Sequence, residues 1–275
     1  MKRILVPTDF SPAADNALGY ALQLGALSGA EVVAVHAVSL PLPEYAVQPE
    51  GIQEYNHYRV EEARLRLEAL YARPDAGDKL TTVLLNGAMQ ELVPEKALQY
   101  DADLIVMGTR GADGLRTVLG TNAAEVLSRS AVPVLVIPDS YEGTLPRRML
   151  LAVQHEENEF LLAPAFQLQA LCGADLITLH IASEDTPVEK LEMRAMELEL
   201  LATKWSHDYG TAAPASEVVS GTDFHAALNG FVRDQDIDMV VMVTHRKTGL
   251  PGRFQKSRTR EQAFQTRVPL LSLHI

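Results

Sequence analysis

The sequence predicts an α/β protein made of two tandem, doubly wound domains, each with a parallel sheet of five strands. Three observations predict this fold class. The chain repeats itself, each copy alternates short apolar runs with helical segments, and a polar segment with a proline at each end (138–146) separates the copies. A chain of 275 residues is long enough for two domains of about 100–150 residues. We expect the domains at residues 1–140 and 147–275.

The repeat rests on three matched segments. Segment 29–36 (GAEVVAVH) returns as 173–180 (GADLITLH), 101–107 (DADLIVM) as 236–242 (DIDMVVM), and 132–137 (VPVLVI) as 268–273 (VPLLSL). The offsets are 144, 135 and 136 residues, and the order along the chain is kept. A series of this kind indicates duplication of one domain.

Each element of the first copy follows from local pattern. Residues 4–6 form a continuous apolar run of the kind buried in a parallel sheet. Ser11 is a good N-cap and Pro12 a good first helical residue, and small or apolar residues then recur at helical spacing as far as Gly25. The remaining elements are expected as strand 32–35, helix 59–70, strand 82–85, helix 91–98, strand 104–107, helix 123–127 and strand 134–137.

This alternation predicts right-handed crossovers and a parallel sheet with helices on both faces. Ligands of such sheets bind beyond the carboxyl ends of the strands, where the strand order reverses. We therefore look for function in the residues that follow each strand.

The first strand is followed by Pro7, Thr8 and Asp9. Asp9 can accept hydrogen bonds from ribose hydroxyls or help to hold a metal ion through water. It can equally do no more than help to start the next helix, and this segment alone leaves both roles open.

The fourth strand is followed by a glycine-rich segment that leads into a helix. Gly108 and Gly111 let backbone N–H groups approach phosphate oxygens, because glycine has no Cβ. Gly120, Thr121 and Asn122 at the helix N-terminus add free N–H donors, a hydroxyl and the positive end of the helix dipole. The alternative is a simple glycine turn with an ordinary helix cap.

Together, segments 4–11 (ILVPTDFS), 103–111 (DLIVMGTRG), 120–121 (GT) and 132–136 (VPVLV) closely resemble the universal stress protein family. The resemblance covers the first copy and, more weakly, the second. It implies a Rossmann-like fold and, for the ATP-binding branch, a Gly-x-x-Gly, nine residues, Gly-Ser/Thr motif. A phosphate and ribose wall is then implied at Gly108, Gly111, Gly120, Thr121 and Asn122. The adenine and ribose side is implied at Pro7, Thr8, Asp9 and Ala37.

The second copy has lost these features. Gly108 aligns with Val243 and Gly111 with Arg246, while Gly120 and Thr121 align with Lys256 and Ser257. Asp9 aligns near Val153 or Gln154, so no acid is in register. Side chains therefore stand where backbone has to meet phosphate, and we expect no ATP site in the second copy. Its segment 245–267 is rich in Lys and Arg and is either a surface for an anion or a partner, or a solvated or internally paired face.

Bulk properties limit the remaining functions. A net charge of -12 argues against general nucleic-acid binding. The single cysteine, Cys172, suggests a reducing compartment, and the short apolar start of the chain suggests neither a signal peptide nor a membrane span, so we expect a cytoplasmic protein. The histidines show no metal-ligand spacing, and neither a nucleophile elbow nor a Walker P-loop is present.

We expect an ATP-binding regulatory protein, with Mg²⁺ as an optional companion of the nucleotide and only slow hydrolysis. The alternative is a nucleotide-free interaction module, in which the two copies form a pseudo-dimer that binds a protein partner. The loop between Gly111 and Gly120 has eight residues where the family pattern has nine, and this favours the alternative. A nucleotide hydrolase is a distant third, because the Ser-Gly-Gly-x-Asp type of loop is absent after the first strand. A homodimer is a further option.

Overall fold

The structure is a computed structural model. It describes residues 1–41, 49–109, 111–112, 116–117, 121–142, 144–154, 159–244 and 267–274. In this part of the chain, no helix combines the length and the apolar character needed to cross a membrane.

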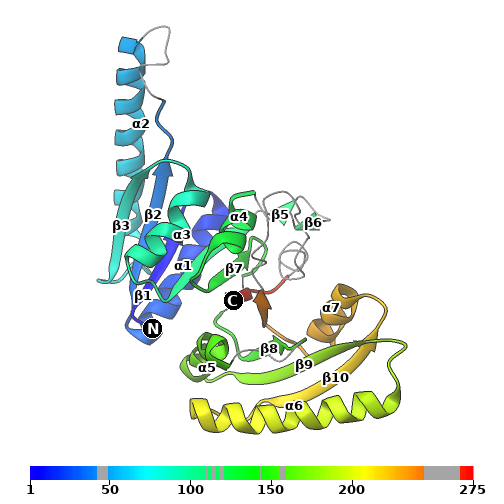
Figure 1. Cartoon of the computed structure of the whole chain (residues 1–275). Coiled ribbons are helices and arrows are strands. Elements are labelled where there is room, and N and C mark those ends of the chain that lie inside the picture. The colour runs from blue at the N-terminus through cyan, green and yellow to red at the C-terminus, as the bar shows by residue number, and fades with distance from the viewer. Residues whose placement is uncertain are drawn as a thin grey trace.

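The first half alternates strands and helices as predicted (Figure 1). Its elements are β1 (Arg3–Pro7), α1 (Pro12–Ser28), β2 (Glu31–Val38), α2 (Pro49–Ala69), the short 3-10 helix η2 (Leu70–Ala72), β3 (Leu80–Asn86), α3 (Met89–Gln99), β4 (Leu104–Thr109), β5 (Gly111–Ala112), β6 (Arg116–Thr117), α4 (Thr121–Arg129) and β7 (Val134–Pro138).

The second half repeats the same order of the main elements. They are β8 (Arg148–Ala152), α5 (Glu159–Cys172), β9 (Asp175–Ser183), α6 (Val188–Tyr209), β10 (Ala215–Gly221), α7 (Phe224–Asp234), β11 (Met239–Thr244) and β12 (Leu270–His274). The duplication and the parallel α/β fold of each half are thereby confirmed.

Helix α1 begins where its sequence signals predict. The Ser11 hydroxyl accepts a hydrogen bond from the N–H of Ala14 at 3.3 Å, which satisfies one of the free donors of the first turn. The helix ends at Gly29, whose φ of 73° is a left-handed conformation that glycine adopts without a Cβ penalty.

The strands of the two halves form one sheet of ten strands, in the order β10-β9-β8-β11-β12-β7-β4-β1-β2-β3. All neighbouring pairs are parallel except β12 and β7, which pair antiparallel with Leu271 opposite Leu135. The two halves meet through these final strands. The expectation of two separate sheets is wrong, because β7 and β12 satisfy their edge N–H and C=O groups by bonding to each other.

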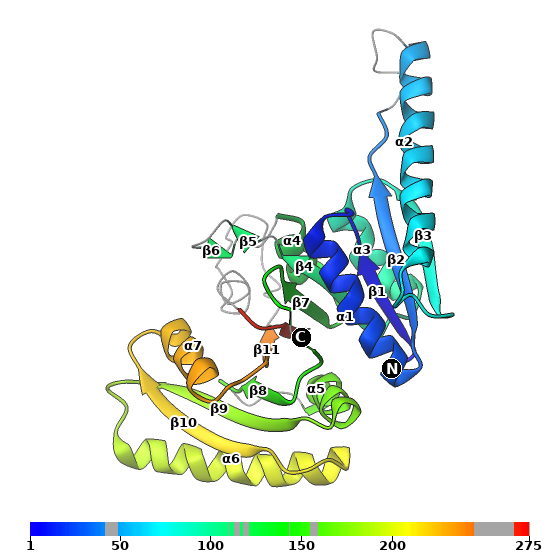
Figure 2. The ribbon, with the colours of Figure 1, turned by 180° about the vertical axis from the view of Figure 1, so that it is seen from behind.

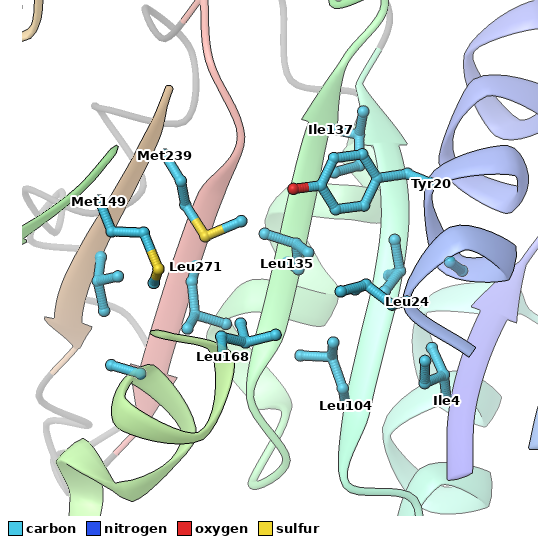
Figure 3. Close-up of a cluster of buried hydrophobic side chains, with 14 of the residues drawn as sticks. Ile4, Tyr20, Leu24, Leu104, Leu135, Ile137, Met149, Leu168, Met239 and Leu271 are labelled. Carbon is cyan, nitrogen blue, oxygen red and sulfur yellow. The ribbon is translucent and has the colours of Figure 1, made fainter. Parts of the chain in front are cut away.

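Helices cover both faces of this sheet (Figures 1 and 2). Helices α1, α5 and α6 pack on one face, and α3, α4 and α7 pack on the other. Each face has a buried cluster that contains residues from both halves. Figure 3 shows one of them, where Leu135 of β7 and Leu271 of β12 lie between residues of the first half and Met149 and Met239 of the second. The hydrophobic core is therefore continuous across the junction.

The hydrogen bonds at the start of the first strand are the same in both halves. The Asp103 carboxylate accepts hydrogen bonds from the N–H groups of Lys2 and Arg3, and the Asp238 carboxylate accepts them from Arg147 at 2.9 Å and Arg148 at 3.0 Å. These aspartates hold the start of the first strand of each half. Their role is structural.

Helix α2 is longer than predicted. It begins at Pro49, ten residues before the expected start at Arg59, and its N-terminal part extends beyond the sheet (Figures 1 and 2). From residue 51 onward, where burial is described, the buried side chains of α2 are Ala63 and Leu67, in its C-terminal part. The amphipathic pattern marks only the packed turns, so the sequence did not reveal the projecting ones.

Candidate functional site

The order of strands reverses at β1 in the first half, which lies between β4 and β2. Pro7 at the end of β1 pairs with Val35 of β2, and Leu5 of β1 pairs with Ile105 of β4. The carboxyl ends of β1, β2 and β4 therefore lie side by side at one edge of the sheet. In sheets of this kind that edge is where ligands bind.

The segment after β1 is held by local hydrogen bonds. Thr8 is buried, its N–H donates to Val35 O at 2.8 Å, and its hydroxyl accepts from the N–H of Phe10 at 3.0 Å. Asp9 is exposed, and its Oδ1 accepts from the N–H of Ser11 at 3.0 Å. Because the Ser11 side chain is the N-cap of α1, Asp9 is not the helix cap. Its carboxylate lies at the surface, at the carboxyl edge of the sheet.

Phe10 follows in a left-handed conformation with φ of 61°, which is uncommon for a bulky residue. Its ring lies 4.5 Å from that of His36, between centroids, and the Arg66 guanidinium lies over it at 5.6 Å. The Nδ1–H of His36 donates to Thr8 O at 2.7 Å, because a carbonyl oxygen can only accept. The second half repeats this last contact, with His180 Nδ1 at 2.9 Å from Val153 O.

Gly108, near the end of β4, is required for packing. A Cβ on Gly108 would overlap the carbonyl group of Ala13 in α1, lying 2.6 Å from its carbon. The next residue, Thr109, is fully buried, and its hydroxyl has no hydrogen-bond partner in the described part of the chain. The sequence pointed to Gly108 as a candidate ligand-binding residue. It did not reveal that Gly108 packs against Ala13, and it did not single out Thr109.

The structure places the other predicted residues as follows. Ala37 lies in β2 opposite Leu85 of β3. Gly111 lies in β5, paired with Thr117 of β6, and Thr121 and Asn122 form the first turn of α4. Gly120 lies outside the described residues. Helix α4 packs on the sheet face that carries Ile105 and Met107. Because side chains alternate along a strand, Ala37 of β2 faces this same side. The start of α4 therefore lies on the side of the sheet that Ala37 faces.

A cavity of about 160 Å³ lies beside this edge, on the opposite face of the sheet. It is lined by Asp9, Phe10, His36 and Val38 from the sheet edge and by residues of α2 that include Arg59 and Arg66. Sites for drug-sized ligands are typically about 300–1,000 Å³, so this cavity is too small for a whole nucleotide. Sequence reasoning missed it. In the sequence, the one sign of this cavity is the spacing of Arg59 and Arg66, which lie seven residues apart on one face of a helix.

At the described positions of the second half, the acid and the first glycine of this edge are replaced. The contact between His180 and Val153 makes Val153 the counterpart of Thr8, so Gln154 stands in place of Asp9. Val243, the counterpart of Gly108, is half-buried and packs against the core. The counterparts of the other glycines, Arg246 and Lys256, lie outside the described residues, as do Ser257 and nearly all of the basic segment 245–267.

Comparison with known proteins identifies the family. The model of the universal stress protein family matches residues 1–138. A universal stress protein of Methanocaldococcus jannaschii is 34% identical over 139 residues, which cover 50% of this chain and 81% of that protein. One from Thermus aquaticus is 34% identical over 142 residues, which cover 50% of this chain and 98% of that protein.

A solved structure extends the likeness of fold to both halves. The universal stress protein from Archaeoglobus fulgidus matches with a TM-score of 0.75 and 20% identity, over 99% of this chain and 98% of that chain. At this identity the match shows the fold alone, and that fold is a doubled one. The chain belongs to the universal stress protein family.

Proposed function

We propose that the chain binds one adenine nucleotide, ATP with or without Mg²⁺, at the carboxyl edge of its first half. One observation carries the proposal. The exposed carboxylate of Asp9, the close-packed Gly108 and the first turn of α4 belong to elements that meet at the point where the strand order reverses. The second half, which has Gln154 and Val243 at the equivalent positions, serves as the natural comparison.

The residues present suit the chemistry of such a ligand. Gly108, Gly111 and Gly120 have no Cβ to keep phosphate oxygens from the backbone, and Thr121 and Asn122 stand at the positive end of a helix dipole. The segment Pro7, Thr8 and Asp9, with Ala37 on the neighbouring strand, would take the base and ribose. Asp9 would accept ribose hydroxyls or hold Mg²⁺ through water.

The proposed role is regulation by binding. The family is named for the stress response, and we propose a single nucleotide site in a chain with two copies of the fold. These features fit a protein whose shape or choice of protein partner depends on the nucleotide. We expect any hydrolysis to be slow. A cytoplasmic location and the division into domains at residues 1–140 and 147–275 belong to the same proposal.

A second candidate function is an interaction module that takes no nucleotide. The eight-residue spacing between Gly111 and Gly120 favours it, since one residue fewer than the family pattern changes the course of a phosphate-binding loop. In that case, the doubled sheet would act as a pseudo-dimeric platform for a protein.

Mass spectrometry of the purified chain after denaturation tests the proposal, because a nucleotide carried through purification is released. Isothermal titration with ATP and Mg²⁺ is expected to give about one site per chain. Gly111→Arg is expected to abolish binding, because a side chain would fill the space needed by phosphate. Arg246→Ala, at the equivalent position of the second half, is the matched control and should leave the affinity unchanged.

Two results would contradict the proposal. A stoichiometry of two would show that the second half retains a site. Absence of binding by the unmodified chain, with no nucleotide released on denaturation, would favour the interaction module.

A further inference from the structure

A second candidate site is the cavity between helix α2 and the ends of strands β1 and β2. Helix α2 stands beside β2 and β3 (Figures 1 and 2). The sheet contributes His36 and Val38 to the lining, and these residues flank Ala37 along β2. Because neighbouring residues of a strand face opposite sides of the sheet, the cavity lies on the face opposite to that of Ala37. It therefore lies outside the space proposed for the nucleotide, although Asp9 borders both.

One wall of the cavity is apolar and aromatic. It is made by the rings of Phe10 and His36, whose centroids lie 4.5 Å apart, and by Val38 and Ala63. The volume of about 160 Å³ is close to that of an engineered protein cavity of about 150 Å³ that takes up benzene. The space therefore suits a ligand with one six-membered ring. Phe10 holds its place in this wall with a φ of 61°, and backbone strain of this kind in a bulky residue is typical of ligand sites.

Helix α2 brings two guanidinium groups to the other wall. The guanidinium of Arg66 pairs with the Glu62 carboxylate at 2.7 Å. Arg59 forms no ion pair with the residues that the structure describes, and its Nη1 donates instead to the Tyr55 hydroxyl at 3.0 Å. A guanidinium carries five N–H donors in a planar fork that fits a carboxylate. Arg59 therefore keeps donors that can bind the carboxylate of a ligand.

Asp9 borders the same cavity and limits where a second negative charge can lie. Its Oδ1 accepts a hydrogen bond from the N–H of Ser11 at 3.0 Å. Its negative charge repels any anion that comes close. The carboxylate of a ligand is therefore best placed at Arg59, with the rest of the ligand toward Phe10 and His36.

We propose that this cavity binds a small carboxylic acid with one aromatic ring. The carboxylate accepts hydrogen bonds from the Arg59 guanidinium, and the ring packs against Phe10 and His36 in the tilted or offset contacts that aromatic groups prefer. The inference adds a second ligand, of another chemical class than the nucleotide. It does not depend on the proposed nucleotide site.

Titration of the full chain with benzoate tests the site, with the amide NMR signals of Phe10 and His36 as the readout. We expect saturable shifts with a Kd of about 1 mM or lower. Benzamide has the same ring without the charge, and inorganic phosphate has charge without the ring. Each is expected to bind at least about ten-fold more weakly than benzoate, because one of the two kinds of contact is missing. An excess of ATP is expected to leave benzoate bound.

Three variants examine the charges. Arg59→Gln should weaken benzoate binding about ten-fold, the usual loss when a charge-assisted hydrogen bond is removed. Arg64→Gln is the matched control, because Arg64 lies on the same helix, pairs with Glu61 at 2.9 Å and does not line the cavity. Asp9→Asn should strengthen benzoate binding about two-fold, because a repulsive charge is lost. This change is opposite in sign to the loss expected for ATP when the Asp9 charge is removed.

Several results would overturn the inference. One is the absence of saturable shifts up to about 10 mM benzoate. Another is equal affinity for benzoate and benzamide, or equal affinity of the unmodified chain and Arg59→Gln for benzoate. Phosphate that binds as tightly as benzoate would mean that the site recognises charge alone, without a ring. Complete displacement of benzoate by ATP would place the cavity within the nucleotide site.

Discussion

The backbone of Gly108 lies directly against the carbonyl group of Ala13, so that strand β4 and helix α1 touch without an intervening side chain. A Cβ at Gly108 would lie 2.6 Å from the Ala13 carbonyl carbon. This contact brings the end of β4 next to the start of α1. The glycine therefore serves the fold at the same place where a nucleotide would need close access to backbone.

Gly108→Ala is expected to destabilise the chain by about 1–3 kcal/mol or more, because backbone on both sides has to move. Gly230→Ala is the matched control, since Gly230 lies inside α7 with nothing within 4 Å of the added Cβ. That change should stabilise the chain by about 0.5–1 kcal/mol. Urea unfolding of both variants measures the effects, and equal midpoints would contradict the contact.

Asp9→Ala is expected to weaken ATP binding by about 1–3 kcal/mol, the usual loss when a charge-assisted hydrogen bond is removed. The free energy of unfolding without nucleotide should change by no more than about 0.5 kcal/mol, because Asp9 is exposed. Asp9→Asn keeps an acceptor for the N–H of Ser11 and isolates the effect of charge.

Ser11→Ala gives the opposite pattern and serves as the control. Removal of the N-cap should cost about 1 kcal/mol of stability and leave ATP affinity nearly unchanged. Thermal melts with and without ATP distinguish the two residues. If Asp9→Ala lowers the melting temperature and keeps the full ATP-induced shift, Asp9 serves the fold alone.

Leu271→Ala removes a fully buried side chain at the junction of β7 and β12, and should cost about 2–5 kcal/mol. Because each buried cluster spans both halves, the whole chain is expected to unfold in one transition. The single tryptophan, Trp205, reports on the second half by fluorescence, and circular dichroism reports on all helices. Coincident urea curves support the continuous core, whereas a separate earlier change in fluorescence would argue against it.

The exposed Leu200 on α6 provides the comparison for this experiment. Its side chain is 72% exposed, so Leu200→Ala should change the free energy of unfolding by no more than about 0.5 kcal/mol. A large effect at Leu200 would mean that α6 is covered in solution.

The Cys172 thiol is expected to react slowly in the native protein. Burial, helped by the negative charge of Asp238, raises the pKa of this thiol to about 11. The reactive thiolate of the folded protein is therefore scarce at pH 8. In the unfolded chain the cysteine has a pKa of about 8.5, so the thiolate is more abundant there. The rate of modification by an aromatic disulfide reagent should rise about a hundred-fold in urea, and equal rates in both states would show an accessible, ordinary thiol.

The same shift makes a prediction for stability at high pH. The pKa of Cys172 is higher in the folded state, so its contribution to stability is fully present below the pKa of the unfolded thiol. It is then lost as the pH rises toward about 11. Cys172→Ala should reduce the decline in melting temperature over this range.

The sequence alone determined the elements whose signals are local. The cap at Ser11 and the apolar strands depend on neighbouring residues, and the repeat, whose offsets lie between 135 and 144 residues, depends on counting. They predicted the doubled α/β fold, and they predicted that the residues after β1 and β4 converge at one edge of the sheet. The same local signals failed for the projecting turns of α2, which have no packed face.

Tertiary structure alone decided what depends on contacts between distant segments. The joining of β7 to β12 into one sheet is such a contact, since an edge strand carries the same residues whether it bonds to water or to a partner strand. So are the contact of Gly108 with Ala13, the cavity beside Phe10 and the buried Thr109 hydroxyl. Periodicity and capping describe how a segment folds on its own, and only packing sets which atoms of two such segments meet.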